Sequence, residues 1–307
     1  MMGEVVIRTE KLTKFYGRQR GVVDLNLEVL RGEVFGFLGP NGAGKTTTIR
    51  LLMDLIRPTR GRAEVLGMDT RTGSVEIRRR VGYLPGEPAL YENLTGEELL
   101  QYVAHLRGGA DWGYLRRLAD RLDCDLSRRV KTLSRGNRQK IALLQAFFHR
   151  PELIIMDEPT SGLDPLVQHE LHRLVREAGE EGTTFFISSH NLPEVEVMCD
   201  RVGIIREGSL AAVDEIEALK RKALRRLEIH FASPVPSEAF SGLPGVRDLS
   251  VEGKTLTCSV TGSVDALIKA ASRFEVLNVT SPEVTLEEIF MEYYREGQNG
   301  MRGEGRA

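Results

Sequence analysis

The run at residues 39–46 reads GPNGAGKT and constrains the fold more than any other feature, because it fits the pattern G-x-x-x-x-G-K-[ST]. Glycines in such a loop let the backbone turn its N–H groups onto phosphate oxygens, and the helix that follows adds a favourable dipole. Both flanks agree, since Val34–Leu38 is apolar like a strand buried on both faces and 46–56 has the pattern of a helix. A random order of this composition gives about 0.01 such matches per chain, so chance is a poor explanation.

The loop predicts binding of ATP with Mg²⁺. We expect the ammonium group of Lys45 to reach the β- and γ-phosphates and the hydroxyl of Thr46 to bind the metal ion. The residues expected to contact the nucleotide here are Gly39, Asn41, Gly42, Ala43, Gly44, Lys45, Thr46 and Thr47.

A second chemical signal is the pair Asp157 and Glu158, which follows the apolar run 153–156. A carboxylate at a strand end beside a phosphate loop can hold Mg²⁺, and we assign this role to Asp157 together with Thr46. The next carboxylate, Glu158, is placed to orient and deprotonate an attacking water, so we expect it to be catalytic. Two acids after four apolar residues would more often be a solvated strand end, and the phosphate loop is what favours the functional interpretation.

The order of predicted elements indicates an α/β fold with a largely parallel sheet. A strand, the loop and a helix are followed by a mainly helical stretch at 87–150, a buried strand at 153–156, a helix from Pro165 and a third buried strand at 183–188. Beyond a charged stretch at 220–226 the pattern changes to that of a split β-α-β-β-α-β unit, which predicts a small ferredoxin-like α+β domain. A closing helix is expected at 286–294, and the glycine-rich tail after it is expected to be disordered.

Composition restricts the partners and the compartment. Lysine and arginine total 42 against 44 acidic residues, so charge gives no reason to expect nucleic acid or an anionic membrane surface as the main partner. The three cysteines, Cys124, Cys199 and Cys258, lack metal-ligand spacing and are interpreted as reduced thiols of a cytosolic protein. The start of the chain lacks the pattern of a signal peptide, and no apolar run approaches the roughly 20 residues that span a bilayer. Any membrane role is therefore expected to come through a partner.

Six motifs in order make the chain resemble an ATP-binding cassette ATPase over about residues 5–219. They are Tyr16, the loop at 39–46, the LSRGN run at 133–137, Asp157-Glu158, the SGLD run at 161–164 and His190. The resemblance implies a P-loop NTPase cassette with an antiparallel β subdomain and a helical subdomain. The expected divisions are a cassette at 1–219 with its helical subdomain at about 87–150, a linker at 220–226, an accessory domain at 227–296 and a disordered tail at 297–307.

The resemblance also implies roles for the remaining site residues. Tyr16 is similar to the aromatic residue that stacks on adenine, and His190 to the switch histidine that contacts the γ-phosphate. Ser134 and Gly136 resemble the family signature, which begins a helix and serves the nucleotide held by the other subunit of a dimer. Asp164 resembles the residue that links the two sites across that interface.

The chain departs from the family pattern in two places. Where the family usually has a glutamine that senses Mg²⁺ and the γ-phosphate, this chain has Gly86 followed by Glu87, so either water fills the space or Glu87 reaches in. The signature carries Arg135 and Asn137 in place of its commoner residues, although Ser134 is kept. Both variants are interpreted as marks of a bacterial exporter subfamily.

The leading hypothesis is the ATP-hydrolysing subunit of a bacterial drug or antibiotic exporter, because one cassette and an added C-terminal domain resemble that branch. The expected partners are a separately encoded integral membrane permease and a second cassette, in a homodimer or in a heterodimer with a related ATPase. The protein would be cytoplasmic and bound to the inner face of the membrane through the permease, and the C-terminal domain would stabilise the dimer. The alternative is a cassette ATPase acting on ribosomes or DNA, but such relatives carry two cassettes, long coiled coils or zinc cysteines.

Overall fold

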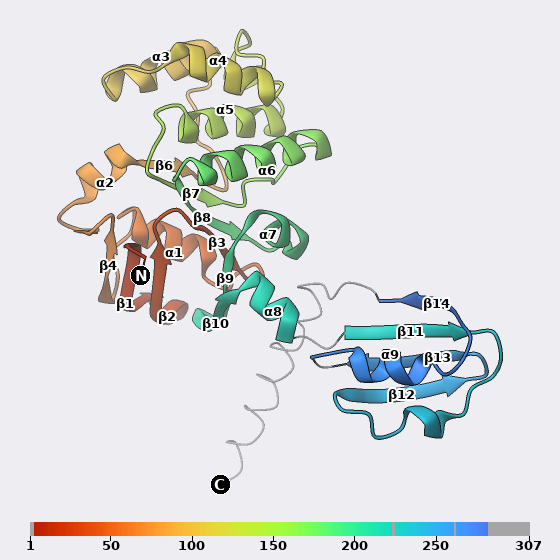
Figure 1. Ribbon diagram of the computed structural model, residues 1–307. Helices are drawn as coiled ribbons and strands as arrows, with labels where there is room; N and C mark the ends of the chain where they lie inside the picture. Colours follow the sequence, from red (N-terminus) through yellow and green to blue (C-terminus); the bar gives the residue numbers. More distant parts are fainter. Residues whose placement is uncertain (1–2, 223–224, 261, 282–307) are drawn as a thin grey trace. The chain divides into compact units, whose positions relative to one another are not determined.

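The computed structural model describes residues 3–222, 225–260 and 262–281, which are drawn as ribbons in Figure 1. The chain divides into two compact units between Asp214 and Glu215. Within the described residues, no helix has both the length and the apolar character that crossing a membrane requires.

The central sheet of the first unit has six strands in the order β10-β9-β3-β8-β7-β6. Strand β3 pairs in parallel with β8 and β9, and β7 pairs in parallel with β6 and β8. Every residue of β3, β7 and β8 is buried, which explains the apolar runs at 34–38, 153–156 and 185–187. The strands are β3 (Val34–Leu38), β6 (Val81–Leu84), β7 (Leu153–Asp157), β8 (Thr184–Ser189), β9 (Arg201–Arg206) and β10 (Ser209–Glu215).

Parallel pairing brings the carboxyl ends of β3, β7 and β8 to one edge of the sheet, which is where α/β sheets place ligands. The phosphate loop follows β3, Glu158 follows β7 and His190 follows β8. The predicted order of buried strands therefore places three of the expected site segments at one edge of the sheet.

A second, antiparallel sheet of the first unit has the order β2-β1-β4-β5. Its apolar side chains share one core with α1 and with β3, including Leu25, Leu27, Ile49 and Phe37. This sheet is the antiparallel subdomain implied by the family resemblance. Its strands are β1 (Val5–Tyr16), β2 (Gln19–Leu30), β4 (Arg60–Val65) and β5 (Met68–Asp69).

The predicted helical stretch forms a subdomain with its own small core, made by Leu99, Val130, Leu133 and Ile141. In Figure 1, α3 and α4 lie on one side of α5 and α6 lies on the other. Helix α1 is shorter than predicted, because Asp54 just beyond its end adopts φ 52°, a left-handed conformation that ends a helix. The helices of this unit are α1 (Lys45–Leu52), α2 (Ser74–Arg80), α3 (Gly96–Leu106), α4 (Trp112–Arg121), α5 (Arg135–Phe147), α6 (Pro165–Glu180) and α7 (Leu192–Met198).

The second unit confirms the ferredoxin-like prediction. Its sheet has the order β12-β13-β11-β14 with antiparallel pairing throughout, the order of a split β-α-β-β-α-β unit, except that the first helix is reduced to a 3-10 turn at Ser237–Phe240. Phe231, Phe240 and Phe274 pack together in its core. The elements are α8 (Ile216–Lys222), β11 (Arg225–Phe231), β12 (Val246–Glu252), β13 (Thr255–Val260), α9 (Asp265–Ala271) and β14 (Val276–Thr280).

The charged stretch predicted to be a linker at 220–226 coincides with the end of α8 and the start of β11; its lysines and arginine at 220–222 are good helix formers and continue α8. The predicted closing helix at 286–294 and the tail after it lie outside the described residues.

Candidate functional site

The phosphate loop lies in a tight space that only glycine fits at two positions. A Cβ atom at Gly44, where φ is 112°, would lie 2.7 Å from the carbonyl oxygen of Gly21, and one at Gly39 would lie 2.4 Å from the carbonyl oxygen of Ile205. Both neighbours are backbone atoms, so neither contact can be relieved by turning a side chain. The loop backbone is therefore held between the start of β2 and the end of β9, and α1 begins at Lys45 directly after it.

Lys45 is buried, and its ammonium group turns towards the loop itself. Its Nζ atom donates to the carbonyl oxygens of Gly39 and Pro40, at 2.7 and 3.2 Å. It also lies 3.2 Å from a carboxylate oxygen of Glu158. These contacts place a positive charge at the centre of the loop, next to the predicted catalytic base.

The carboxylate of Asp157 is 2% exposed and uses both oxygens. Oδ2 accepts a hydrogen bond from the Thr46 hydroxyl at 2.7 Å, and Oδ1 accepts one from the Ser188 hydroxyl. Ser188 is the residue that pairs with Asp157 across the parallel strands β7 and β8, so the register of the sheet positions this contact. Burial raises the pKa of nearby Tyr83, and the negative charge of Asp157 raises it further.

The donor set at Asp157 and Thr46 fits Mg²⁺. One carboxylate and one hydroxyl are the few protein oxygens that this ion takes when phosphates and water supply the rest of its shell. A metal that requires a cage of protein ligands is a poor fit, since among the described residues no three His, Cys, Asp or Glu side chains cluster for that purpose.

Glu158 and His190 are in direct contact, with 2.7 Å between Oε2 of Glu158 and Nδ1 of His190. The backbone of Glu158 has φ 50°, which a residue with a side chain rarely adopts, and its N–H donates to the carbonyl oxygen of Ser188 at 3.1 Å. Residues held in such a conformation cluster at functional sites. The turn after β7 therefore aims the carboxylate of Glu158 back at the end of β8.

Tyr16 lies at the end of β1 with its ring 44% exposed. A Cβ atom added to Gly21 would lie 3.0 Å from the Tyr16 ring and 3.2 Å from the methyl group of Thr47, so Gly21 alone separates the ring from the start of α1. The Nζ atom of Lys14 lies 5.4 Å from the ring centroid. An exposed aromatic face beside the phosphate loop is the geometry that stacking on a base requires.

The SGLD run packs against the start of α5. Ser134 is the N-cap of this helix, and its hydroxyl accepts a hydrogen bond from the N–H of Asn137 at 3.3 Å. A Cβ atom at Gly136 would lie 2.5 Å from the carbonyl oxygen of Gly162, so the two backbones touch. Asp164 caps α6 by accepting a hydrogen bond from the N–H of Val167 at 3.1 Å.

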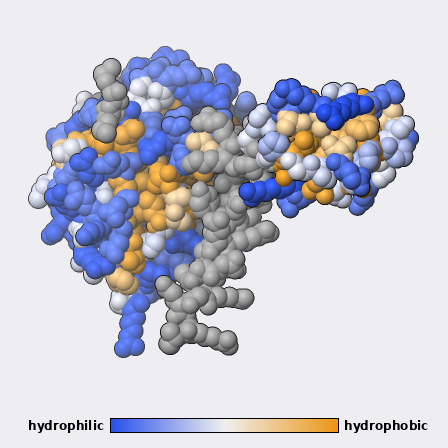
Figure 2. Space-filling view, turned by 60° about the horizontal axis from the view of Figure 1, so that its bottom comes forward, coloured by the Kyte–Doolittle hydropathy of each residue, from blue (hydrophilic) through white to orange (hydrophobic). Residues whose placement is uncertain are grey.

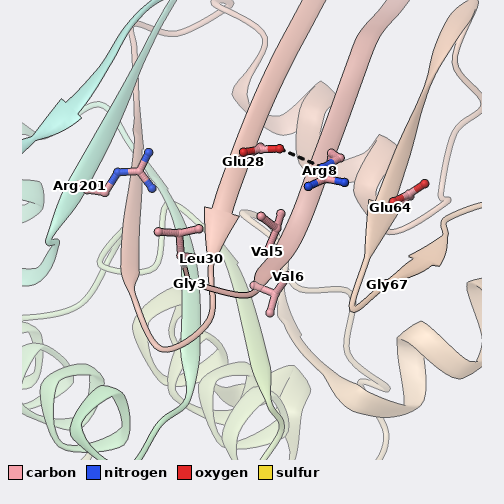
Figure 3. A pocket seen from close by; sticks show the side chains of 9 residues that line it. All are labelled: Gly3, Val5, Val6, Arg8, Glu28, Leu30, Glu64, Gly67 and Arg201. Atoms are coloured by element: carbon pink, nitrogen blue, oxygen red, sulfur yellow. Dashed lines mark hydrogen bonds and ion pairs between the residues drawn. The ribbon is translucent and has the colours of Figure 1, made fainter. Parts of the chain in front are cut away.

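A hollow of about 750 Å³ in the first unit lies away from these residues, between the start of β1 and the end of β2 (Figure 3). The two arginine side chains that line this hollow are both in ion pairs, Arg8 with Glu28 and Arg201 with Glu33. The hollow therefore offers no free positive charge to a phosphate, in contrast to the loop at Lys45.

Comparison with known proteins decides the family. A model of the ABC transporter family matches residues 22–161. Over 303 residues the chain is 36% identical to the bacitracin transport ATP-binding protein of Bacillus licheniformis, covering 96% of this chain and 99% of that protein. The linearmycin resistance ATP-binding protein of Bacillus subtilis is 31% identical over 302 residues, covering 93% of this chain and 97% of that protein. A solved structure of the ATP-binding subunit of an ABC transporter is similar with a TM-score of 0.65 and 34% identity, covering 70% of this chain and 92% of that one.

The chain belongs to the ABC transporter ATP-binding family. It is an ATP-binding and ATP-hydrolysing subunit of an ABC transporter, as the sequence motifs predicted. One part of the predicted ABC site is held together by direct contacts. Lys45 pairs with Glu158, Glu158 contacts His190, and Thr46 donates a hydrogen bond to Asp157. A second part, Ser134, Gly136 and Asp164, gathers around the SGLD run that follows Glu158.

Gly86, where the ABC family usually has glutamine, lies beside the predicted metal ligand. A Cβ atom at Gly86 would lie 3.4 Å from Oδ2 of Asp157, the same oxygen that accepts the Thr46 hydroxyl. The next residue, Glu87, is exposed, and with Gly86, Arg135 and Arg138 it lines a hollow of about 350 Å³. The two alternatives, water in the space beside Gly86 or Glu87 reaching into it, both stay predictions.

Two residues of this ABC site were missed by sequence reasoning. Ser188, which holds Asp157, lies in the run before His190, and that run was interpreted through its histidine alone. Glu194 lies in α7, behind the predicted catalytic pair, and an acid in a helical pattern is indistinguishable from a solvated one until its burial is known.

Proposed function

We propose that this chain energises the export of an antibiotic-like compound through a separately encoded membrane permease. Support comes from the near full-length likeness to ATP-binding proteins named for bacitracin transport and for linearmycin resistance. In this proposal the chain is cytoplasmic and is held at the inner face of the membrane by the permease. Two copies, or one copy and a related ATPase, close around two ATP molecules.

The phosphate loop forms the first half of each site. Nζ of Lys45 exchanges the loop carbonyls and Glu158 for phosphate oxygens, while the backbone N–H groups of the loop surround the β-phosphate. Tyr16 stacks on the adenine ring. Thr46 and Asp157 hold Mg²⁺, which neutralises phosphate charge when it is bound.

Glu158 and His190 carry the chemical step. The oxygen of a water attacks the γ-phosphorus, the bond from that phosphorus to the bridging oxygen breaks, and Glu158 accepts the proton that the water loses. His190, held 2.7 Å from Glu158, is close enough to orient this carboxylate and to contact the γ-phosphate.

The second half of each site is provided by Ser134, Gly136 and Asp164 and serves the nucleotide of the partner cassette. The observation that carries this proposal is the close approach between Gly136 and the backbone of Gly162. Because Gly162 lies in the turn that follows Glu158, a shift of that turn towards α5 during hydrolysis would press on the start of this helix. The state of one nucleotide is thereby passed to the surface that the other nucleotide contacts.

The variant Glu158→Gln tests the assignment of the base. The amide keeps the size of the side chain but cannot accept the proton, so we expect ATP to be bound, a dimer to be trapped and steady phosphate release to be lost. Light scattering with and without ATP and a phosphate-release assay measure the two effects. The exposed carboxylate of Glu180 provides a control, and Glu180→Gln is expected to behave like the wild type. Near-normal phosphate release by Glu158→Gln would refute the assignment.

Export itself is tested by expressing the chain together with an integral membrane permease, if one is encoded beside its own gene. We expect membrane association and resistance to bacitracin only when both proteins are present, and neither with Glu158→Gln. Co-sedimentation with ribosomes or DNA, without dependence on the permease, would instead support the ribosome or DNA hypothesis.

A further inference from the structure

A buried carboxylate, that of Glu194, contacts residues close to Glu158 and His190 in sequence. Glu194, in α7, is 8% exposed, and its side chain accepts three hydrogen bonds. Oε2 accepts from the hydroxyl of Thr160 at 2.7 Å and from that of Ser189 at 3.3 Å. Oε1 accepts from the side-chain amide of Asn191 at 2.9 Å.

These three partners flank Glu158 and His190. Thr160 lies two residues after Glu158, and Ser189 and Asn191 are the residues on either side of His190. One carboxylate thus ties the turn after β7 to the turn after β8, and the side chains of Glu158 and His190 meet at 2.7 Å on those same turns.

The same contacts extend to two other segments of the site. The carbonyl oxygen of Ser189 accepts a hydrogen bond from the N–H of Gly39, at 3.3 Å, so this turn also touches the first residue of the phosphate loop. Thr160 begins the stretch that leads to Asp164, and its carbonyl oxygen accepts a hydrogen bond from the amide of Gln168 in α6 at 3.3 Å.

We infer that Glu194 is a positioning residue that sets the relative placement of Glu158 and His190 and couples both to the turn carrying Asp164. This inference rests on the roles proposed above for Glu158 and His190. Glu194 acts through Thr160, Ser189 and Asn191, because its own carboxylate is buried among them. Burying a carboxylate costs free energy unless it is hydrogen-bonded, and here every identified hydrogen bond comes from an active-site turn.

Removing the carboxylate of Glu194 tests whether this residue affects the rate of hydrolysis without affecting the binding of ATP. Glu194→Ala deletes all three acceptors, and a misplacement of about 1 Å at a catalytic group can lower turnover about 10²-fold. We expect a fall in kcat of that order, with the ATP dissociation constant changed less than about twofold, because Ser189 contacts the phosphate loop through its backbone. Glu194→Gln, whose oxygen still accepts from Asn191 and whose NH₂ group can donate to the Thr160 hydroxyl, should retain most of the turnover.

A double-mutant cycle with His190→Ala decides whether Glu194 acts through the catalytic pair. If it does, Glu194→Ala should lower kcat less than about twofold further once His190 is absent, since the arrangement it maintained is already lost. Losses that multiply in the double variant would overturn the inference, as would a parallel loss of ATP binding and thermal stability in Glu194→Ala. A wild-type kcat for His190→Ala would instead refute the role of His190, which is a different failure.

Thr160→Val keeps the test available if Glu194→Ala does not fold. It removes one hydroxyl at constant shape, so it breaks the 2.7 Å hydrogen bond and leaves those from Ser189 and Asn191. We expect kcat to fall with unchanged ATP affinity, and little further loss in the His190→Ala background. A Thr160→Val enzyme with normal kcat would contradict the inference.

Discussion

Single residues in this cassette show how burial can fix a charge state. His149 follows α5, is largely buried and lies against Phe148, with 5.1 Å between the ring centroids. Burial lowers the pKa of His149 to about 4, and the positive charge of Arg107 adds to this effect. The imidazole is therefore neutral at pH 7, and protonation must oppose folding.

The pH dependence of stability tests this at His149. Its folded pKa lies below the unfolded value, so the unfolded chain binds the proton first, and the contribution to stability, complete above about pH 6.5, is lost as the pH falls towards 4. We expect His149→Leu to lose about 2 kcal/mol less unfolding free energy than the wild type between pH 7 and 4.5. Urea unfolding at both values measures this, and equal losses in the two proteins would contradict the charge assignment.

At the scale of elements, the two helices α4 and α5 each carry a glycine at the second position, Gly113 and Gly136. Around Gly113 a Cβ atom would meet only the ends of side chains, at 3.3 Å and beyond. Around Gly136 it would meet the backbone oxygen of Gly162 at 2.5 Å. The same residue at the same helical position is therefore optional in one helix and required in the other.

Replacing each of these glycines by alanine measures the difference. Gly113→Ala should raise the unfolding free energy by up to about 1 kcal/mol, because alanine is the better helix former. Gly136→Ala should lower it by about 1–3 kcal/mol and reduce ATP turnover, because the SGLD turn must move away from α5. Chemical unfolding and phosphate release provide the readouts, and equal effects of the two changes would refute the proposed contact.

Sequence reasoning succeeded at this scale where the signal is local. The loop at 39–46 and Asp157 after its apolar strand could be placed because strand, loop and helix are adjacent along the chain. The contact of Gly136 with Gly162 and the role inferred for Glu194 could not, because they depend on how segments far apart in sequence pack. The first helix expected in the second unit was also not predicted correctly. Only a short 3-10 turn, Ser237–Phe240, forms at that place.

At the scale of the whole molecule, the described residues of the two units form separate cores that share no buried residue. The core of the second unit is built around β11, β13 and α9, and the buried residues of the two clusters in the first unit all come before residue 206, with Leu210 and Val213 packed against one of them. Figure 2 shows apolar surface on each unit. Separate cores predict that the first unit can fold and bind ATP without the second.

Truncation after Leu219 tests this independence together with the expected role of the C-terminal domain. We expect the shortened chain to bind ATP with an affinity within about twofold of the full chain, because the phosphate loop and its neighbours are unchanged. Dimerisation with ATP, measured in the Glu158→Gln background by sedimentation, should weaken. An unchanged dimer affinity would refute a dimer-stabilising role for residues 227–296.

The ammonium group of Lys45 pairs with the carboxylate of Glu158, and in the proposed mechanism the same ammonium group also binds the phosphates of ATP. One ammonium group serves either the carboxylate or the incoming triphosphate, so each ATP molecule must displace Glu158 in order to bind. The displaced carboxylate is the proposed proton acceptor for the attacking water. In the proposed mechanism, binding of the substrate and release of the base are thus a single exchange at the ammonium group of Lys45.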